Sequence, residues 1–405
     1  MTKIDFSVFD HIEYLPGVPL DKLYGDRLRQ IEHLDAAGFY GYHLAEHHTP
    51  ATHAMAPSQN VFLTAASQRT ERLRLIPTVY VLPLYHPLRL IEEICMLDPL
   101  SDGRLEIAVG AGGVLEAYFW GHEGDPETNR ARFEETLAIV RQGLTHDELN
   151  YQGRFYSFDR VPMRLRPNQR PCPPFWYMRN SATAAKRGFN VVLEGSLDHV
   201  QANVKRYRRL WSETFGQGAP TEQGQEPKVG ANFFTVVADT DEQAVALGRK
   251  AWDAFRENLL GPRRRVAEQR GLAQFLTAGS AYTSGAFGAD EPPAAVIPTQ
   301  HRYVAREEMR EIEASISHLS AEERAERERR RLPGGLGKGI LAGPNVIAGS
   351  PDSIRAFMDE YVTTGANYLS CAFQFGCLTH EQAMRSIQLF STEVMPGYRP
   401  AAVLA

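Results

Sequence analysis

The stretch Gly38-Phe39-Tyr40-Gly41-Tyr42-His43-Leu44-Ala45-Glu46-His47-His48 brings a helix end, a strand and a polar cluster into one short run. Gly38 is the residue type that most often ends a helix in the left-handed conformation. Residues 40–45 are apolar and aromatic, as in a buried strand, and Glu46-His47-His48 follows this strand directly. α/β folds place their chemistry at such strand ends. The stretch therefore predicts an α/β fold with a candidate site after its second strand.

The rest of the chain repeats this alternation of strand and helix. Helical spacing is clear before the stretch, from Leu20 to Leu34, and after it, from Leu90 to Leu97 and from Phe133 to Leu144. Strands are predicted at 6–9, 40–45, 73–82, 105–109, 175–178, 191–193, 231–237 and 368–375. Eight such units suggest a (β/α)8 TIM barrel, an α/β fold with a parallel sheet. A doubly wound open sheet is the alternative, but no GxGxxG turn follows the first strand.

The last predicted unit carries clear helix boundary signals. Ser350-Pro351-Asp352 combines a capping residue, a first-turn proline and an acid at a helix start, and Gly365 ends that helix. Thr379 and Gln382 have the spacing of a capping box ahead of the final helix.

Two segments exceed what a bare barrel needs. We expect a single domain over 1–405, with a small polar and proline-rich insertion at 145–175. A longer insertion is predicted at 262–345, between the seventh and eighth strands. It contains a charged helical stretch at 307–331, and long connections of this kind are often lids.

The composition describes a globular protein that binds something small. Of 405 residues, 43% are hydrophobic and 23% charged, and the net charge is −5, so neither nucleic acid nor an anionic membrane meets a basic field. The cysteines show no CxxC spacing, which indicates reduced thiols. No apolar run is long enough for a membrane span, and residues 1–5 lead into a strand rather than a signal peptide. We expect a cytoplasmic protein.

The imidazoles after the second strand suit proton transfer, because histidine titrates near neutral pH. His43, His47 and His48 are close in sequence, but no carboxylate or cysteine accompanies them at helical ligand spacing. The sequence therefore predicts no metal site.

Three stretches together resemble the bacterial luciferase-like family of flavin-dependent monooxygenases. The first runs from Gly38 to His48. The second runs from Val81-Leu82-Pro83-Leu84-Tyr85-His86-Pro87 through Glu92 to Leu100-Ser101-Asp102-Gly103-Arg104-Leu105. The third runs from Gly349-Ser350-Pro351 to Val394-Met395-Pro396.

The resemblance implies a (β/α)8 barrel that forms a homodimer, with the insertion at 262–345 near the active site. It implies a two-component enzyme that takes reduced FMN (FMNH2) from a separate flavin reductase. In such enzymes the flavin reacts with O2 to give a C4a-(hydro)peroxide, which attacks a small, largely apolar organic substrate.

The resemblance also assigns roles to residues. His47 is the expected acid/base or peroxide-contacting residue, with Glu46 and His48 setting its tautomer. Cofactor contacts are expected at Thr78-Val79, where the family often has a non-proline cis peptide, and at Gly110 and Ala111 after the fourth strand. Many relatives have an arginine at the position of Ala111, so we expect Arg179, Asn180 and Ser181 to recognise the phosphate instead. Gly110 stands where luciferase itself has a reactive cysteine, which argues against bioluminescence.

Aromatic residues near strand ends could wall off the site, since a reactive flavin must be shielded from water. The expected substrate walls are Phe9, Tyr42, Tyr80 and Trp120, with Trp176 beside them and Tyr177 at the cofactor. Two other functions stay open: a deazaflavin (F420)-dependent oxidoreductase that transfers hydride on the same barrel, and a flavin-binding protein without turnover.

Overall fold

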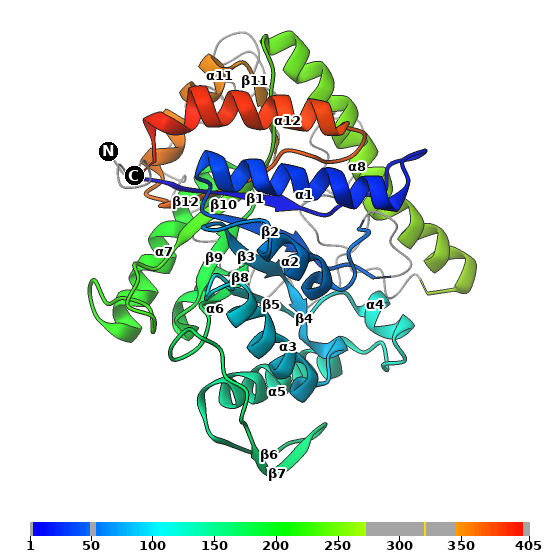
Figure 1. Cartoon of the computed structure of the whole chain (residues 1–405), viewed down its shortest axis with the longest axis vertical. Helices are drawn as coiled ribbons and strands as arrows, with labels where there is room; N and C mark the ends of the chain where they lie inside the picture. The colour runs from blue at the N-terminus through cyan, green and yellow to red at the C-terminus, as the bar shows by residue number, and fades with distance from the viewer. Residues whose placement is uncertain (1–2, 49–53, 273–319, 321–345, 400–405) are drawn as a thin grey trace.

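The computed structural model describes residues 3–48, 54–272, 320 and 346–399. Parallel strands form its centre and helices surround them (Figure 1). The strands of the main sheet are β1 (Asp5–Asp10), β2 (Gly41–Ala45), β3 (Arg74–Thr78), β4 (Tyr80–Val81), β5 (Ile107–Gly110), β8 (Phe175–Met178), β9 (Asn190–Leu193), β10 (Val229–Val237), β11 (Val346–Gly349) and β12 (Tyr368–Ala372).

The helices follow the strands in the order expected of a βα alternation. They are α1 (Leu20–Ala37), α2 (Gln59–Ser67), α3 (Pro87–Leu100), α4 (Val114–Phe119), α5 (Pro126–Thr145), α6 (Ser181–Arg187), α7 (Leu197–Phe215), α8 (Asp241–Arg270), α11 (Pro351–Thr363) and α12 (His380–Leu389). Short turns of helix lie at η1 (Leu82–Leu84), η4 (Phe390–Val394) and η5 (Met395–Gly397).

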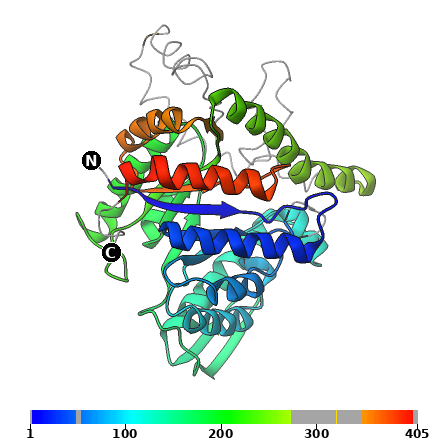
Figure 2. The same cartoon turned by 45° about the horizontal axis from the view of Figure 1, so that its top comes forward.

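The main sheet closes on itself. Its strand order is β3-β2-β1-β12-β10-β9-β8-β5-β4, with β11 beside the carboxyl half of β10. A parallel bridge between Leu75 and Leu105 joins β3 to the segment that leads into β5 and completes the ring. Pairing of β1 with β12 brings α1 and α12, from opposite ends of the chain, together beside β1 (Figure 2). The structure confirms the (β/α)8 barrel.

The predicted strands all correspond to observed ones, with two differences. The predicted strand 73–82 is divided into β3, β4 and η1, and β11 had no counterpart among the predicted strands. The capping signals are confirmed: Gly38 is left-handed (φ 80°), Ser350 caps α11, and Thr379 and Gln382 form both hydrogen bonds of a capping box on α12.

The insertion at 145–175 contains an antiparallel hairpin of β6 (Glu148–Gln152) and β7 (Ser157–Pro162). The insertion predicted from residue 262 begins inside α8, which continues to Arg270. Residues 273–319 and 321–345, including the predicted charged helix, lie outside the described residues. No helix in the described part of the chain is long and apolar enough to cross a membrane.

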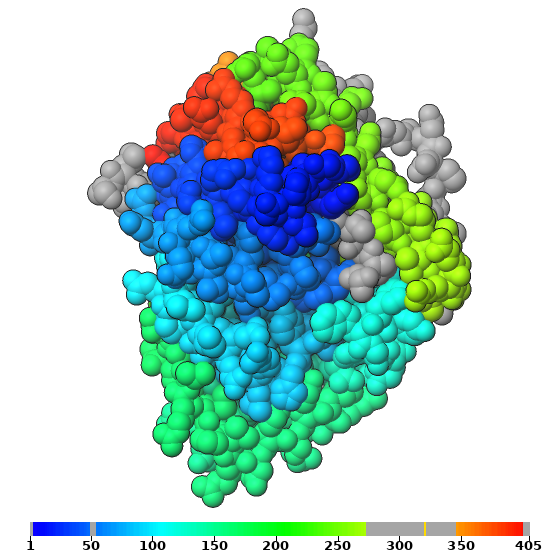
Figure 3. Space-filling model, turned by 45° about the vertical axis from the view of Figure 1, so that its right-hand side comes forward, coloured from blue at the N-terminus to red at the C-terminus, as the bar shows by residue number. Residues whose placement is uncertain are grey.

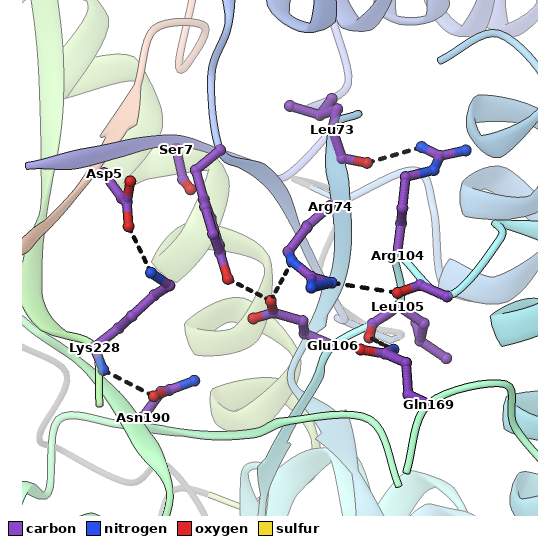
Figure 4. Close-up of polar contacts among 12 residues, drawn as sticks. Asp5, Ser7, Leu73, Arg74, Arg104, Leu105, Glu106, Gln169, Asn190 and Lys228 are labelled. Atoms are coloured by element: carbon purple, nitrogen blue, oxygen red, sulfur yellow. Dashed lines mark hydrogen bonds and ion pairs between the residues drawn. The ribbon is translucent and has the colours of Figure 1, made fainter. Parts of the chain in front are cut away.

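Polar residues tie the amino-terminal end of the barrel together. The buried carboxylate of Glu106 accepts hydrogen bonds from the Tyr40 hydroxyl (2.5 Å) and the Trp176 indole, and it pairs with Arg74 (2.9 Å). Lys228 pairs with Asp5 across the same end (2.5 Å; Figure 4). Paired polar side chains therefore occupy this end of the barrel. The opposite end is left for a ligand, as in other barrels of this type.

Candidate active site at the carboxyl ends of the strands

The inner face of the barrel has a closed aromatic floor. Trp176 and Tyr368 are fully buried there and pack at 4.7 Å between ring centroids. Val79 and Met178 contact this floor from the carboxyl side, and both are partly exposed. Side chains thus fill the barrel axis up to Trp176, and the partly exposed Val79 and Met178 side chains lie above this level.

His47 meets two charged side chains from other elements. The Arg263 guanidinium of α8 contacts the His47 Nδ1 atom at 3.1 Å and the Glu116 carboxylate of α4 at 2.6 Å. Glu116 Oε1 lies 3.5 Å from the same Nδ1 atom and accepts the backbone N–H of His48 (3.3 Å). Burial lowers the pKa of His47, although the hydrogen bond that a protonated ring would donate to Glu116 acts in the opposite sense. Desolvation raises the pKa of Glu116, but the hydrogen bond available from a protonated His47 ring and the charge of Arg263 outweigh it and lower the pKa to about 2.

His11 extends the cluster toward the first strand. Its ring stacks on that of His47, with 5.6 Å between centroids and 15° between planes, and it contacts Phe9 and Phe255. Burial holds the pKa of His11 well below its usual value, and the charges of His47, Arg263 and Arg179 lower it further. At neutral pH His11 is therefore an uncharged ring in the wall of the site.

Glu46 supports His48 rather than His47, which corrects the expectation that it sets the tautomer of His47. One Glu46 oxygen lies 2.8 Å from His48 Nε2, and the other accepts the Tyr85 hydroxyl at 2.6 Å. The His48 ring packs edge-on against Trp120 (4.7 Å), whose side chain is about half exposed. Side chains two residues apart project in the same general direction along an extended chain, so Glu46 reaches His48 and not the ring between them.

The expected cofactor residues on β3 and β5 lie at the carboxyl ends of these strands, close to the end of β2. Ala45, at the end of β2, pairs with Thr78, at the end of β3, so Glu46 and Val79 are the next residues after the two strands. The Thr78–Val79 peptide bond is cis, as the resemblance implies, and the Thr78 hydroxyl contacts the buried ring of His43 (2.7 Å). A Cβ at Gly110 would lie 2.6 Å from the Val79 side chain, so only glycine lets these strands pack this way. Ala111 follows Gly110 and offers its carbonyl to Asn129 (2.8 Å).

Arg179 stands at the rim after β8, with its side chain half exposed and its backbone in the left-handed region (φ 68°). Glu194, at the end of β9, binds its guanidinium through both oxygens (2.8 and 3.3 Å). Asn180 caps α6 by accepting the Thr183 N–H (2.9 Å). The buried Ser181 hydroxyl donates to Asn203 on α7 (2.6 Å). An anion at this rim would therefore compete with Glu194 for Arg179.

The structure separates the aromatic residues that the sequence grouped together. Phe9 faces inward, with Phe234 and Phe255, in a buried apolar cluster at the carboxyl end. Tyr42, Tyr80 and Tyr177 lie in the layer between strands and helices instead: Tyr42 donates to Asp10 (2.7 Å), Tyr80 to Asn60 (2.5 Å), and Tyr177 packs on Phe133. Neighbouring residues on a strand point to opposite faces, so the inward positions of His43 and Trp176 turn Tyr42 and Tyr177 outward.

Sequence reasoning missed His11, Glu116 and Arg263. His11 follows the first strand as His47 follows the second, so the same signal could have found it. Glu116 lies in the first turn of a short helix after a glycine run, which is a weaker signal. Arg263 stands 216 residues from His47, and only the packing of α8 on α4 brings it there (Figure 3). His43 is engaged inside the barrel, and in the part of the chain that the structure describes no group of His, Cys, Asp or Glu is arranged to hold a metal.

The barrel, with titratable groups gathered at the carboxyl ends of its strands, has the architecture of barrel enzymes. The chain belongs to the luciferase-like monooxygenase family, whose family model matches residues 5–368, and it is an oxidoreductase. It is 41% identical to the uncharacterized protein y4wF of Sinorhizobium fredii over 269 residues. This aligned region covers 64% of this chain and 74% of that protein. It is 24% identical to the oxygenase component of the flavin-dependent trigonelline monooxygenase of Acinetobacter baylyi, over 59% of this chain and 66% of that protein.

Solved structures share the fold at low sequence identity. The oxygenating constituent of 3,6-diketocamphane monooxygenase from Pseudomonas putida, in complex with FMN, has a TM-score of 0.67 at 16% identity and covers 98% of this chain and 100% of its own. The coenzyme F420-dependent tetrahydromethanopterin reductase of Methanopyrus kandleri has a TM-score of 0.60 at 17% identity, with the same coverage. These likenesses concern the barrel, which serves more than one flavin chemistry.

Proposed function

We propose that this protein is the oxygenase of a two-component monooxygenase that uses reduced FMN and O2 on a small, largely apolar organic molecule. The observation that carries the proposal is the position of His47 just after β2, where its ring stacks on His11 and contacts Arg263, in a member of a monooxygenase family. In the net reaction one oxygen atom enters the substrate, the other leaves as water, and reduced FMN is oxidised.

The residues at this end of the barrel fit a flat aromatic cofactor with an anionic tail. Val79 and Met178 expose apolar surface above the floor, and Gly110 adds no side chain beside them. Arg179 places a half-exposed cation at the rim. Thr78, Val79, Gly110 and Ala111 would hold the ring system, and Arg179, Asn180 and Ser181 the phosphate. Reduced FMN, when bound, supplies the electrons that activate O2.

The protein's own contribution is exclusion of water and control of protons. Phe9, Phe234 and Phe255 form a buried apolar wall next to His11, which removes competing water from the reacting atoms. His47 holds or moves a proton at the substrate. The Arg263 contact fixes the position of its ring, and its lowered pKa keeps the ring uncharged near neutral pH.

The partners follow from the same proposal. A two-component oxygenase needs a flavin reductase to supply FMNH2, either by contact or by diffusion. We place a second copy of the chain on α2 and α3, which lie side by side on one flank of the barrel (Figure 1). Val61 on α2 and Met96 on α3 are 73% and 56% exposed, unusual values for apolar residues on neighbouring helices.

The deciding experiment mixes the protein with photoreduced FMN without oxygen, measures binding, and then follows flavin absorbance after rapid mixing with oxygenated buffer. Tight binding and slower flavin oxidation than in free solution are expected, followed by oxygenated product in a substrate screen. Binding of FMN with no change in its oxidation under any substrate would instead indicate a flavin-binding protein without turnover.

An F420-dependent oxidoreductase is the second candidate, because a solved F420-dependent reductase shares this barrel. The pairing of Arg179 with Glu194 reduces the net positive charge at the rim for the phosphate of either cofactor, and Ala111 adds none. Binding of F420 with hydride transfer, and no binding of reduced FMN, would establish this alternative.

A further inference from the structure

The contact between Arg263 and His47 restricts where the imidazole can carry its proton. A guanidinium has only N–H donors and no acceptor. Its Nη2 atom lies 3.1 Å from His47 Nδ1, within hydrogen-bond distance, so Nδ1 must be the acceptor and carry no hydrogen. In a neutral ring the proton is then on Nε2, at the opposite edge.

Glu116 stabilises this arrangement instead of competing with it. Its Oε1 atom is 2.6 Å from Arg263 but 3.5 Å from His47 Nδ1, so the short contact goes to the guanidinium. The backbone N–H of His48 takes a further position on the same oxygen (3.3 Å). The Arg263 and Glu116 side chains are 21% and 6% exposed, which limits screening of the pair by solvent.

Both partners come from elements that pack against each other independently of His47. Leu115 of α4 and Ala267 of α8 share a small buried cluster, and Arg270 lies over the Phe119 ring at 5.4 Å. The position of Arg263 is therefore set by helix packing.

We propose that Arg263 is a positioning residue that holds His47 as the neutral Nε2–H tautomer, which makes the Nε2 edge of the ring a hydrogen-bond donor rather than a base. Glu116 fixes the guanidinium in place for this purpose. The inference deepens the proposed function, since it gives His47 the role of a donor toward an oxygen atom of the bound ligand. Its structural part, the tautomer, rests on no cofactor.

The groups that face His47 define what a test must control. In the described part of the chain they include His11, stacked on the ring; His48, its neighbour in the chain; Glu116 from α4; and Arg263 from α8. Among the residues that the structure describes, loss of the Arg263 guanidinium leaves Glu116 as the charged group nearest to Nδ1. The neutral ring should then carry its proton on Nδ1 and donate a hydrogen bond from there to the Glu116 carboxylate.

The test is nitrogen NMR of the protein labelled with ¹⁵N-histidine at pH 7.5, with His47 assigned by the signal lost in His47→Gln. We expect an unprotonated Nδ1 and a protonated Nε2 in the wild type. In Arg263→Met the Nδ1 signal should shift to the protonated range, and Arg263→Lys should restore the wild-type pattern, because lysine is also only a donor.

Arg265→Met is the matched control, since Arg265 lies on the same helix in an exposed pair with Glu257. It should leave the His47 signals unchanged. A wild-type ring protonated at Nδ1, or an Arg263→Met spectrum identical to wild type, would overturn the inference, with circular dichroism showing that each variant is folded. Since no flavin or turnover enters this measurement, it can succeed or fail independently of the proposed function.

Discussion

Glu13 is a buried carboxyl group beside the barrel mouth. Folding raises its pKa, whereas folding lowers the pKa of most carboxyl groups that have charged partners. Its oxygens accept the Gly376 N–H (2.8 Å) and the Asn258 amide (3.1 Å), but desolvation raises its pKa to about 7, helped by Asp10 and opposed by Arg27. The folded state therefore holds this proton more tightly than the unfolded chain does. Its contribution to stability is full below pH 4.5 and is lost as the pH rises to about 7.

We therefore predict that Glu13→Gln reduces the loss of stability on going from pH 5 to pH 8. The difference from wild type should reach up to about 3 kcal/mol, which corresponds to the size of the pKa shift. Urea unfolding at both pH values measures it, with the exposed Glu257→Gln as control. Parallel changes in wild type and Glu13→Gln would show that Glu13 does not titrate in this range.

His47 makes the second prediction at the scale of a residue. His47→Ala removes the ring but leaves Val79, Gly110 and Arg179 unchanged, so FMN affinity should stay within about three-fold while product formation falls roughly 100-fold. Fluorescence titration and product analysis separate the two effects. Unchanged turnover in this variant would remove His47 from its assigned role.

At the scale of elements, α8 covers the carboxyl end of the barrel. Figures 1 and 2 show this long helix along the rim, and Trp252 and Phe255 pack their rings on Phe234 of β10 at 5.2 and 4.6 Å. Gly376 makes this close approach possible, because a Cβ there would lie 1.9 Å from the Ala251 carbonyl oxygen of α8. The position of α8 is thus determined by apolar packing on one side and backbone contact on the other.

We predict that Phe255→Ala lowers the free energy of unfolding by about 3–5 kcal/mol, because it leaves a cavity among fully buried rings. Urea unfolding measures the change. The matched control is Phe215→Ala at the end of α7, where the ring is 45% exposed and the loss should stay near about 1 kcal/mol. Equal losses in both variants would mean that α8 does not depend on this packing.

At the scale of the whole molecule, the proposed dimer should depend on α2 and α3. Val61→Asp places a charge at the centre of the exposed apolar surface, and we expect the mass in solution to fall from that of a dimer to that of a monomer. Light scattering after size exclusion measures this mass. Phe215→Asp, on an exposed site at the end of α7, should leave the dimer intact. A monomeric wild type would refute the proposed dimer outright.

Much of this protein is determined by patterns within a few residues. Buried strands such as 41–45, the left-handed Gly38 and the Thr379 capping box depend on neighbours close in sequence, and each was predicted correctly. The place of Glu46-His47-His48 at the end of β2 follows from the same local pattern. Local hydrogen bonds and side-chain periodicity are set by the chain itself, so one sequence suffices to infer them.

Only the tertiary structure decided which side chains meet at the site. It placed Tyr42 outside the barrel and His43 inside, because the direction in which a strand faces depends on how the sheet closes. It also brought Arg263 to His47 across 216 residues, since the packing of α8 against α4 fixes that distance and no local pattern records it.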